Sequence, residues 1–118
     1  MAEAQKRIIA LFDVDQTLTP PRSTVRQNML DTLTKMQAKG IDFGIVSGSD
    51  LVKVREQMTP AITDAAHYCF AENGLDAYKL GVPIEKQSFN KHLGEDNLKR
   101  LVNFILHYIA DLDIPIKR

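Results

Sequence analysis

The chain of 118 residues contains one cysteine, carries no excess charge of either sign and has no long hydrophobic run. A lone thiol, Cys69, cannot form a disulfide within the chain, which indicates a reducing compartment such as the cytoplasm. Fifteen Lys and Arg residues balance fifteen Asp and Glu residues, so no overall positive field favours a nucleic acid or an anionic membrane. No apolar run approaches the roughly 18 residues that cross a bilayer, and residues 1–7 do not resemble a signal peptide. We therefore expect a cytoplasmic protein with no nucleic-acid or membrane partner.

A hydrophobic share of 44% and a charged share of 25% are typical of one globular domain. Three short apolar runs predict strands buried on both faces of a parallel sheet: Ile8–Val14, Ile41–Val46 and Tyr68–Ala71. Helical periodicity occupies the intervals, at about 24–39 and 51–58. This alternation predicts an α/β fold, with a partial parallel sheet and flanking helices.

The starts of these two helices have candidate caps. Ser23 or Thr24 can cap the first helix, and Ser49 or Asp50 can cap the second, because their side-chain oxygens accept hydrogen bonds from free backbone N–H groups. The inward face of the second helix is predicted to carry Leu51, Val54 and Met58.

The later part of the chain has a different pattern. Residues 75–87 predict an antiparallel hairpin, in which Pro83 indicates an edge strand because proline has no N–H to donate. A helix is predicted from about 94 to 112, and Phe104 and Leu106 lie outside its apolar stripe. Such a helix needs a second covering surface, either further chain or a partner.

Asp13 and Asp15 stand at the carboxyl end of the first predicted strand, where open α/β sheets bind ligands. The chain can turn there so that one side chain and one backbone carbonyl face a cation, and Mg²⁺ prefers this all-oxygen set. One carboxylate can then attack phosphorus while the other moves a proton. An isolated D-x-D is more simply a pair of solvated turn carboxylates. Here, however, the preceding strand is wholly apolar, so we predict that both aspartates are catalytic and bind metal.

Three segments resemble the haloacid dehalogenase superfamily: D-V-D-Q-T-L-T-P-P-R from Asp13, I-V-S-G-S-D from Ile45 and A-E-N-G-L-D-A-Y-K from Ala71. Within that superfamily, the chain from Ile8 to Arg118 is similar to eukaryotic-type α-phosphomannomutases. The resemblance implies a Rossmannoid core followed by the start of an α+β cap. It also implies an isomerase that interconverts mannose 6-phosphate and mannose 1-phosphate through an aspartyl phosphate, for GDP-mannose biosynthesis. The implied cofactors are Mg²⁺ and a mannose or glucose 1,6-bisphosphate activator, and the implied partners are a hexose phosphate and a second copy bound through the cap helix.

By the same resemblance, Asp13 matches the nucleophile, and Asp15 matches the general acid/base whose backbone carbonyl binds Mg²⁺. Arg22 matches an arginine that binds the substrate phosphate, for which a planar guanidinium is well suited, although it can also be a solvated loop residue. A second phosphate-binding segment, with a hydroxyl and backbone N–H groups at a helix start, is matched by Ser47, Gly48 and Ser49.

The resemblance divides the chain into residues 1–74, the first part of the catalytic core, and residues 75–118, the beginning of a cap that looks truncated. Asn73, at this boundary, either serves the site or builds the turn, and we favour the turn. The tail from Asp111 to Arg118 starts a new apolar alternation and then stops.

Two departures from the family pattern keep alternatives open. Gln16 stands where the mutase motif has glycine, so a bulky side chain would strain the backbone if that site needs a positive φ. No later lysine, acidic cluster or arginine-rich cap strand follows to complete the site. The alternatives are a catalytically silent remnant that binds or dimerises, and a small sugar-phosphate phosphatase.

Overall fold

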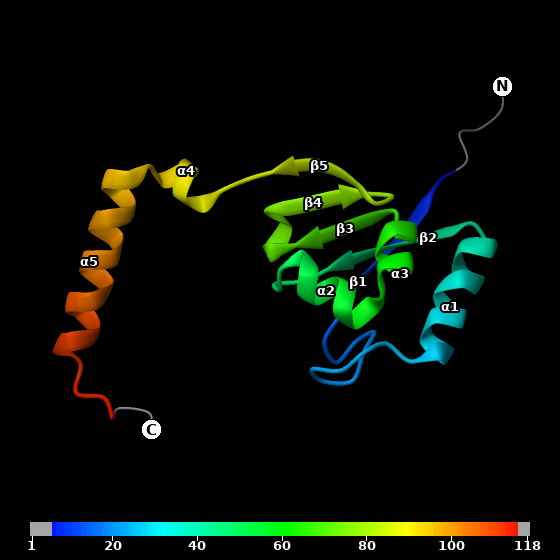
Figure 1. Cartoon of the computed structure of the whole chain (residues 1–118), viewed down its shortest axis with the longest axis horizontal. Coiled ribbons are helices and arrows are strands. Elements are labelled where there is room, and N and C mark those ends of the chain that lie inside the picture. The colour runs from blue at the N-terminus through cyan, green and yellow to red at the C-terminus, as the bar shows by residue number, and fades with distance from the viewer. Residues whose placement is uncertain (1–5, 116–118) are drawn as a thin grey trace. The chain divides into compact units, whose positions relative to one another are not determined.

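The computed structural model describes residues 6–115, apart from the side chain of Glu85. Within these residues, five strands form one sheet in the order β1-β2-β3-β4-β5 (Figure 1). The strands are β1 (Ile8–Asp13), β2 (Ile41–Val46), β3 (Tyr68–Ala71), β4 (Asp76–Lys79) and β5 (Val82–Lys86). Ile116–Arg118, the end of the predicted apolar alternation, lie outside the described residues.

The strand directions confirm the predicted α/β arrangement, but the predicted burial on both faces was wrong for β1, where Ile8, Ile9 and Leu11 are exposed. β1, β2 and β3 pair in parallel, and β3, β4 and β5 pair antiparallel. Pro83 lies on the edge strand β5, as its missing N–H requires. Because the register sets Asp13 beside Val46 and Val46 beside Phe70, the carboxyl ends of the three parallel strands meet at one edge of the sheet.

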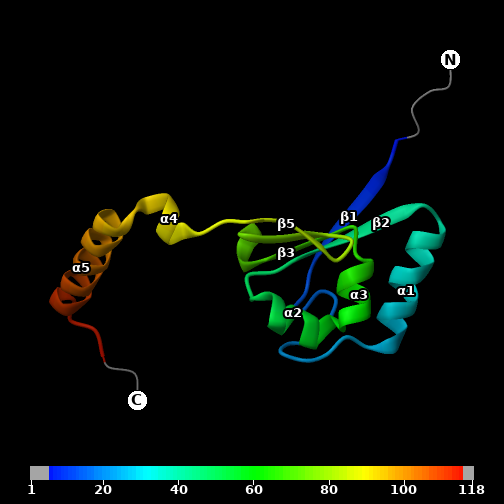
Figure 2. The same cartoon turned by 45° about the horizontal axis from the view of Figure 1, so that its top comes forward.

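Three helices cover one face of this sheet (Figures 1 and 2). They are α1 (Gln27–Ala38), α2 (Leu51–Met58) and α3 (Pro60–Ala65). The fully buried core lies between the helices and the strands and includes Leu33, Phe43, Ile45, Val54 and Met58. The predicted inward residues Val54 and Met58 are therefore confirmed as core.

One of the two predicted helix caps is confirmed. Asp50 caps α2, and its Oδ1 accepts a hydrogen bond from the Lys53 backbone N–H at 2.8 Å. The prediction for α1 was wrong, because that helix begins after Arg26 and has no side-chain cap. The segment before it is held otherwise, since the Val25 N–H donates to the Gln57 carbonyl at 2.7 Å.

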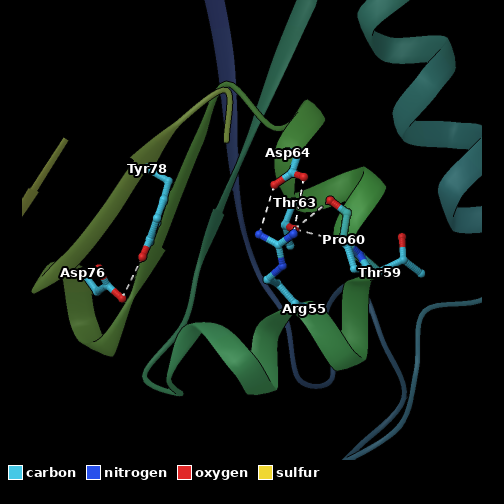
Figure 3. A network of polar contacts seen from close by, with 7 residues as sticks. All are labelled: Arg55, Thr59, Pro60, Thr63, Asp64, Asp76 and Tyr78. Carbon is cyan, nitrogen blue, oxygen red and sulfur yellow. Dashed lines mark hydrogen bonds and ion pairs between the residues drawn. The ribbon is translucent and has the colours of Figure 1, made fainter. Parts of the chain in front are cut away.

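Helix α2 is fixed against α3 by polar contacts (Figure 3). The Arg55 guanidinium donates to both carboxylate oxygens of Asp64, at 3.2 and 3.4 Å. Within the first turn of α3, the Thr63 hydroxyl donates to the carbonyls of Thr59 and Pro60. The contact between Arg55 and Asp64, together with the buried Val54 and Met58, holds α2 at a defined place on the sheet.

The chain divides into two compact units, Met1–Lys86 and Gln87–Arg118. The hairpin of β4 and β5 belongs to the first unit because it extends the sheet through β3. The second unit contains α4 (Phe89–Leu93) and the long helix α5 (Glu95–Asp111), which are joined at Gly94. In the described part of the chain, no helix combines the length and apolar character needed to span a membrane. The predicted division at 74/75 between core and cap stays a prediction.

Candidate functional site

The predicted site residues gather where β1, β2 and β3 end. Asp13 is the last residue of β1, and Ser47 directly follows its register partner Val46 on β2. Neighbouring strands lie about 4.8 Å apart, so Asp13 and the Ser47 loop are adjacent. The turn after β3, η1 (Glu72–Gly74), lies at the same edge.

The D-x-D segment leaves β1 in a tight turn built on one carbonyl. The Val14 oxygen accepts hydrogen bonds from the backbone N–H groups of Thr17, Leu18 and Thr19, at 3.2, 3.0 and 3.0 Å. Val14 and Leu18 are buried, which anchors the turn in the core. Asp13 therefore stays on the strand, whereas Asp15 lies on the turn.

Gln16 has φ 62°, in the left-handed region that glycine adopts without strain. The sequence analysis expected backbone strain if this position needs a positive φ. The backbone at this turn has that positive φ, and the glutamine adopts it at an energetic cost.

One carboxylate oxygen of Asp15 is held by two donors from elsewhere in the chain. The Arg22 backbone N–H donates to Asp15 Oδ1 at 3.1 Å, and the Gln57 side-chain Nε2 donates to the same oxygen at 2.8 Å. Among residues 6–115, no group donates to Oδ2. Asp15 is therefore fixed on one side while its second oxygen stays free for chemistry.

The Ser47 loop is attached to the turn after β3. The Asn73 N–H donates to the Ser47 carbonyl at 3.0 Å, and the Glu72 N–H donates to the Ser49 carbonyl at 2.9 Å. A Cβ added to Gly48 would lie 3.4 Å from Oδ1 of Asn73, so the Asn73 side chain lies beside this glycine. Asn73 has φ 57° and builds the turn, as favoured from the sequence.

The loop offers few free backbone donors for a phosphate. The Ser47 N–H binds the Phe70 carbonyl, and the Ser49 N–H binds the Ser47 hydroxyl oxygen at 3.1 Å. At the start of α2, the Lys53 N–H already donates a hydrogen bond to the Asp50 side chain. Within the described chain, the Gly48 N–H has no partner, so it and the Ser47 hydroxyl hydrogen are the donors best placed for an anion.

Arg22 is exposed, with φ 49°, and its backbone rather than its guanidinium contacts Asp15.

Asp13 and Asp15 offer a metal ion only oxygen ligands, the type that Mg²⁺ prefers. No group of three or more His, Cys, Asp and Glu side chains in residues 6–115 could hold a metal ion. Because Mg²⁺ keeps several water ligands and needs only one or two protein carboxylates, the two aspartates suit it as a partial ligand set.

Sequence reasoning missed Gln57. It follows Val54 by three residues and precedes Met58, so it lies on the inward face of α2. A polar residue at an inward helical position was the available signal, because a buried amide needs hydrogen-bond partners. The closest of those partners, Asp15, is 42 residues away in sequence, and periodicity does not identify such a contact.

Comparison with known proteins agrees with this arrangement. The family model described as eukaryotic phosphomannomutase matches residues 29–118. The chain belongs to this family. A phosphomannomutase of Arabidopsis thaliana is 52% identical over 118 residues, and the match covers 100% of this chain and 48% of that protein. Phosphomannomutase 2 of Dictyostelium discoideum is 50% identical over 113 residues, which are 96% of this chain and 45% of the relative. The chain thus spans about half the length of these phosphomannomutases.

Solved structures support the fold of this family member. A haloacid dehalogenase-like hydrolase from B. subtilis aligns with a TM-score of 0.64 at 20% identity, over 85% of this chain and 34% of that one. A phosphatase of the same superfamily from Bacteroides thetaiotaomicron aligns with a TM-score of 0.59 at 22% identity, over 89% of this chain and 39% of that one. The sheet is therefore a haloacid dehalogenase-like core, as the sequence predicted.

Proposed function

We propose that this phosphomannomutase-family chain carries the phosphoryl-transfer half of a mutase site, which interconverts mannose 6-phosphate and mannose 1-phosphate. The main support is the placement of Asp13 at the end of β1, next to the Ser47 loop, with Asp15 held through Oδ1 on the following turn. We assign Asp13 as nucleophile and Asp15 as general acid/base. We assign the phosphate-binding roles to Arg22, Ser47, Gly48 and Ser49.

The reaction proceeds in two balanced steps. An Asp13 oxygen attacks one phosphorus of the sugar 1,6-bisphosphate, the bond from that phosphorus to the sugar oxygen breaks, and Asp15 gives its proton to that oxygen, which leaves phosphorylated Asp13 and a sugar monophosphate. In the second step Asp15 takes a proton from the free hydroxyl of the isomeric sugar monophosphate, and the resulting oxygen attacks the aspartyl phosphate, which releases the Asp13 carboxylate and restores the bisphosphate. The monophosphate released in the first step and the one consumed in the second carry their phosphate on different oxygens, so the two steps together isomerise the sugar phosphate.

Asp13 and Asp15 are the residues we propose to hold Mg²⁺, Asp13 through its carboxylate and Asp15 through its backbone carbonyl. When bound, Mg²⁺ supplies positive charge that reduces repulsion between the carboxylate and the incoming phosphate. The chain's own residues orient that phosphate, because the Gly48 N–H and the Ser47 hydroxyl stand beside the end of β1. A sugar 1,6-bisphosphate would phosphorylate Asp13 and prime the cycle.

The test follows the phosphate on the protein. The chain is incubated with Mg²⁺ and mannose 1,6-bisphosphate, and the aspartyl phosphate is trapped with hydroxylamine and located by mass spectrometry. We expect modification at Asp13, and its loss in Asp13→Asn. Asp31→Asn, which changes an exposed aspartate on α1, is the matched control. Unmodified wild-type protein would show that this chain is catalytically silent.

Product analysis separates the mutase from a phosphatase. With mannose 1-phosphate as substrate, we expect mannose 6-phosphate to accumulate in amounts that depend on the bisphosphate. Free phosphate without isomerised sugar would instead assign the chain as a phosphatase.

The proposed location of this activity is the cytoplasm, where it would supply GDP-mannose biosynthesis. Cys69, the one thiol, is buried and unpaired, which supports a reducing compartment.

We further propose that α5 forms a homodimer interface. Its apolar side chains are exposed over several turns: Leu101, Val102, Phe104, Ile105, Leu106, Tyr108 and Ile109. The rings of Phe104 and Tyr108 stack at 6.0 Å, which gives this surface a flat aromatic part. An apolar helix face of this extent is typical of an interface.

Sedimentation measures the association directly. We expect the chain to sediment as a dimer, and Phe104→Glu to convert it to a monomer. Val52→Glu, which adds the same charge at an equally exposed apolar residue on α2, is expected to leave the dimer intact. A wild-type monomer at micromolar concentration would contradict the proposal.

A further inference from the structure

The Asp15 carboxylate is held unequally. Its Oδ1 has two donors, whereas its Oδ2 has none among residues 6–115. We propose that Gln57 is a positioning residue for Asp15, whose amide fixes Oδ1 so that Oδ2 is the oxygen that carries the transferred proton. This inference rests on the proposed phosphoryl transfer, and its experiments include one that does not depend on activity.

Burial makes the Gln57 amide a fixed donor. The residue is only 4% exposed, and Nε2 lies 2.8 Å from Asp15 Oδ1 and 3.4 Å from the Ser23 carbonyl. A buried amide that lost these partners would be left without hydrogen bonds, which costs free energy. The contact to Asp15 therefore persists instead of exchanging with water.

The helix that carries Gln57 cannot easily shift. Val54 and Met58 on either side of it are fully buried, and Arg55 ties the same helix to Asp64 of α3. The Gln57 backbone carbonyl also accepts the Val25 N–H at 2.7 Å. Gln57 thus connects α2 to Asp15 through its side chain and to Val25, just before α1, through its backbone carbonyl.

A neutral amide suits a group that changes its protonation state. Asp15 must be protonated before the first step and ionised after it. When Oδ2 carries the proton, Oδ1 is a carbonyl-type oxygen that still accepts a hydrogen bond, so the amide donor serves both states.

The first experiment observes the contact by NMR in the full chain. We expect the Gln57 side-chain amide resonance to shift in Asp15→Ala, because its closest acceptor is removed. The Gln37 amide, which binds the Ala65 carbonyl at 3.0 Å, is expected to stay unchanged and serves as the matched control. An unshifted Gln57 resonance would overturn the proposal whether or not the chain is active.

The second experiment varies the leaving group. Mannose 1,6-bisphosphate releases a sugar oxygen that needs a proton, whereas acetyl phosphate releases acetate, which needs none. General acid catalysis contributes roughly 10²–10⁴-fold, so we expect Gln57→Met to slow phosphorylation of Asp13 by the bisphosphate about 10-fold or more. With acetyl phosphate the change should stay below about 2-fold, because the acid is not used.

A merely structural role would give a different pattern. Equal slowing with both donors, or no slowing with either, would overturn the proposal. Gln37→Met should leave both rates unchanged. If Gln57→Met fails to fold, the NMR comparison still decides, since it needs only wild type and Asp15→Ala. A shifted Gln57 resonance in a chain that accepts phosphate from neither donor would support the contact and contradict the proposed function alone.

Discussion

The backbone N–H of Asn73 donates to the carbonyl oxygen of Ser47 at 3.0 Å, so the turn after β3 supports the loop after β2. This bond requires the left-handed conformation of Asn73, with φ 57° and ψ 31°. Asparagine tolerates that region better than other residues with a Cβ. The shape of the proposed phosphate loop therefore depends on a residue outside it.

Asn73→Gly is expected to preserve stability, because glycine adopts a positive φ without strain. Asn73→Ala should lower the free energy of unfolding by about 1 kcal/mol. Urea denaturation measures both. Asn28→Ala, on helix α1, is the control and should be neutral or slightly stabilising, since alanine favours helix. Equal stabilities of Asn73→Ala and Asn73→Gly would contradict this account.

Gln16→Gly should raise the free energy of unfolding by up to about 1 kcal/mol, because the left-handed strain at φ 62° outweighs the added freedom of the unfolded chain. Thermal unfolding followed by circular dichroism is suitable. Gln37→Gly, within helix α1, should instead lower the free energy of unfolding by about 1 to 2 kcal/mol, because glycine disfavours a helix and the hydrogen bond to the Ala65 carbonyl is lost. A loss at both positions would show that Gln16 makes a stabilising contact that offsets its backbone strain.

Asp50→Ala should destabilise the protein by about 1 kcal/mol, because Lys53 loses the side-chain acceptor for its N–H. Asp50→Asn keeps an acceptor and should retain most of the stability. Ser49→Ala should change the free energy of unfolding by less than about 0.5 kcal/mol, since Ser49 does not cap the helix. Chemical denaturation of the three variants tests which residue is the cap.

Stability should fall in alkali. Burial, the largest cause, raises the pKa of the Cys69 thiol from 9.0 to about 11, and Asp76 and Asp64 add to the rise while Arg55 opposes it. The folded pKa lies above the unfolded one, so this stability is complete below pH 9 and is lost as pH rises to about 11. The loss is about 2 to 3 kcal/mol.

Denaturation in urea across pH 8–11 measures this effect, and Cys69→Ala should flatten the profile. Stability should still depend on pH to some extent in that variant, because burial and a hydrogen bond to Asp76 also raise the pKa of Tyr78. An identical slope in wild type and Cys69→Ala would exclude the thiol as its cause.

Much of the core could be predicted because its signals are local. The apolar runs of β1, β2 and β3 and the missing N–H of Pro83 determined strand positions and the sheet edge. The acidic pair at the end of β1 was likewise visible, and strand order then placed it beside the Ser47 loop.

The remainder depended on contacts between distant segments. Ser23 and Thr24 are good capping residues, yet α1 starts after Arg26, and the Gln57 carbonyl accepts a hydrogen bond from Val25 in the segment before it. No local sequence pattern marks Asp15 as the acceptor of a hydrogen bond from the Gln57 side-chain amide, because the two residues meet only after α2 has packed on the sheet. Propensity and periodicity do not contain that information.

The number of residues in α2 limits which insertions and deletions this protein tolerates. Asp50 and Gln57 are seven residues apart, which is about two helical turns, so the cap and the amide lie on the same side of the helix. Insertion of one residue between them would rotate Gln57 by about 100° and advance it about 1.5 Å. Substitutions on the outer surface of α2 should be accepted freely, whereas insertions and deletions of single residues should not. The position of Gln57 relative to Asp50 therefore depends on the number of residues between them.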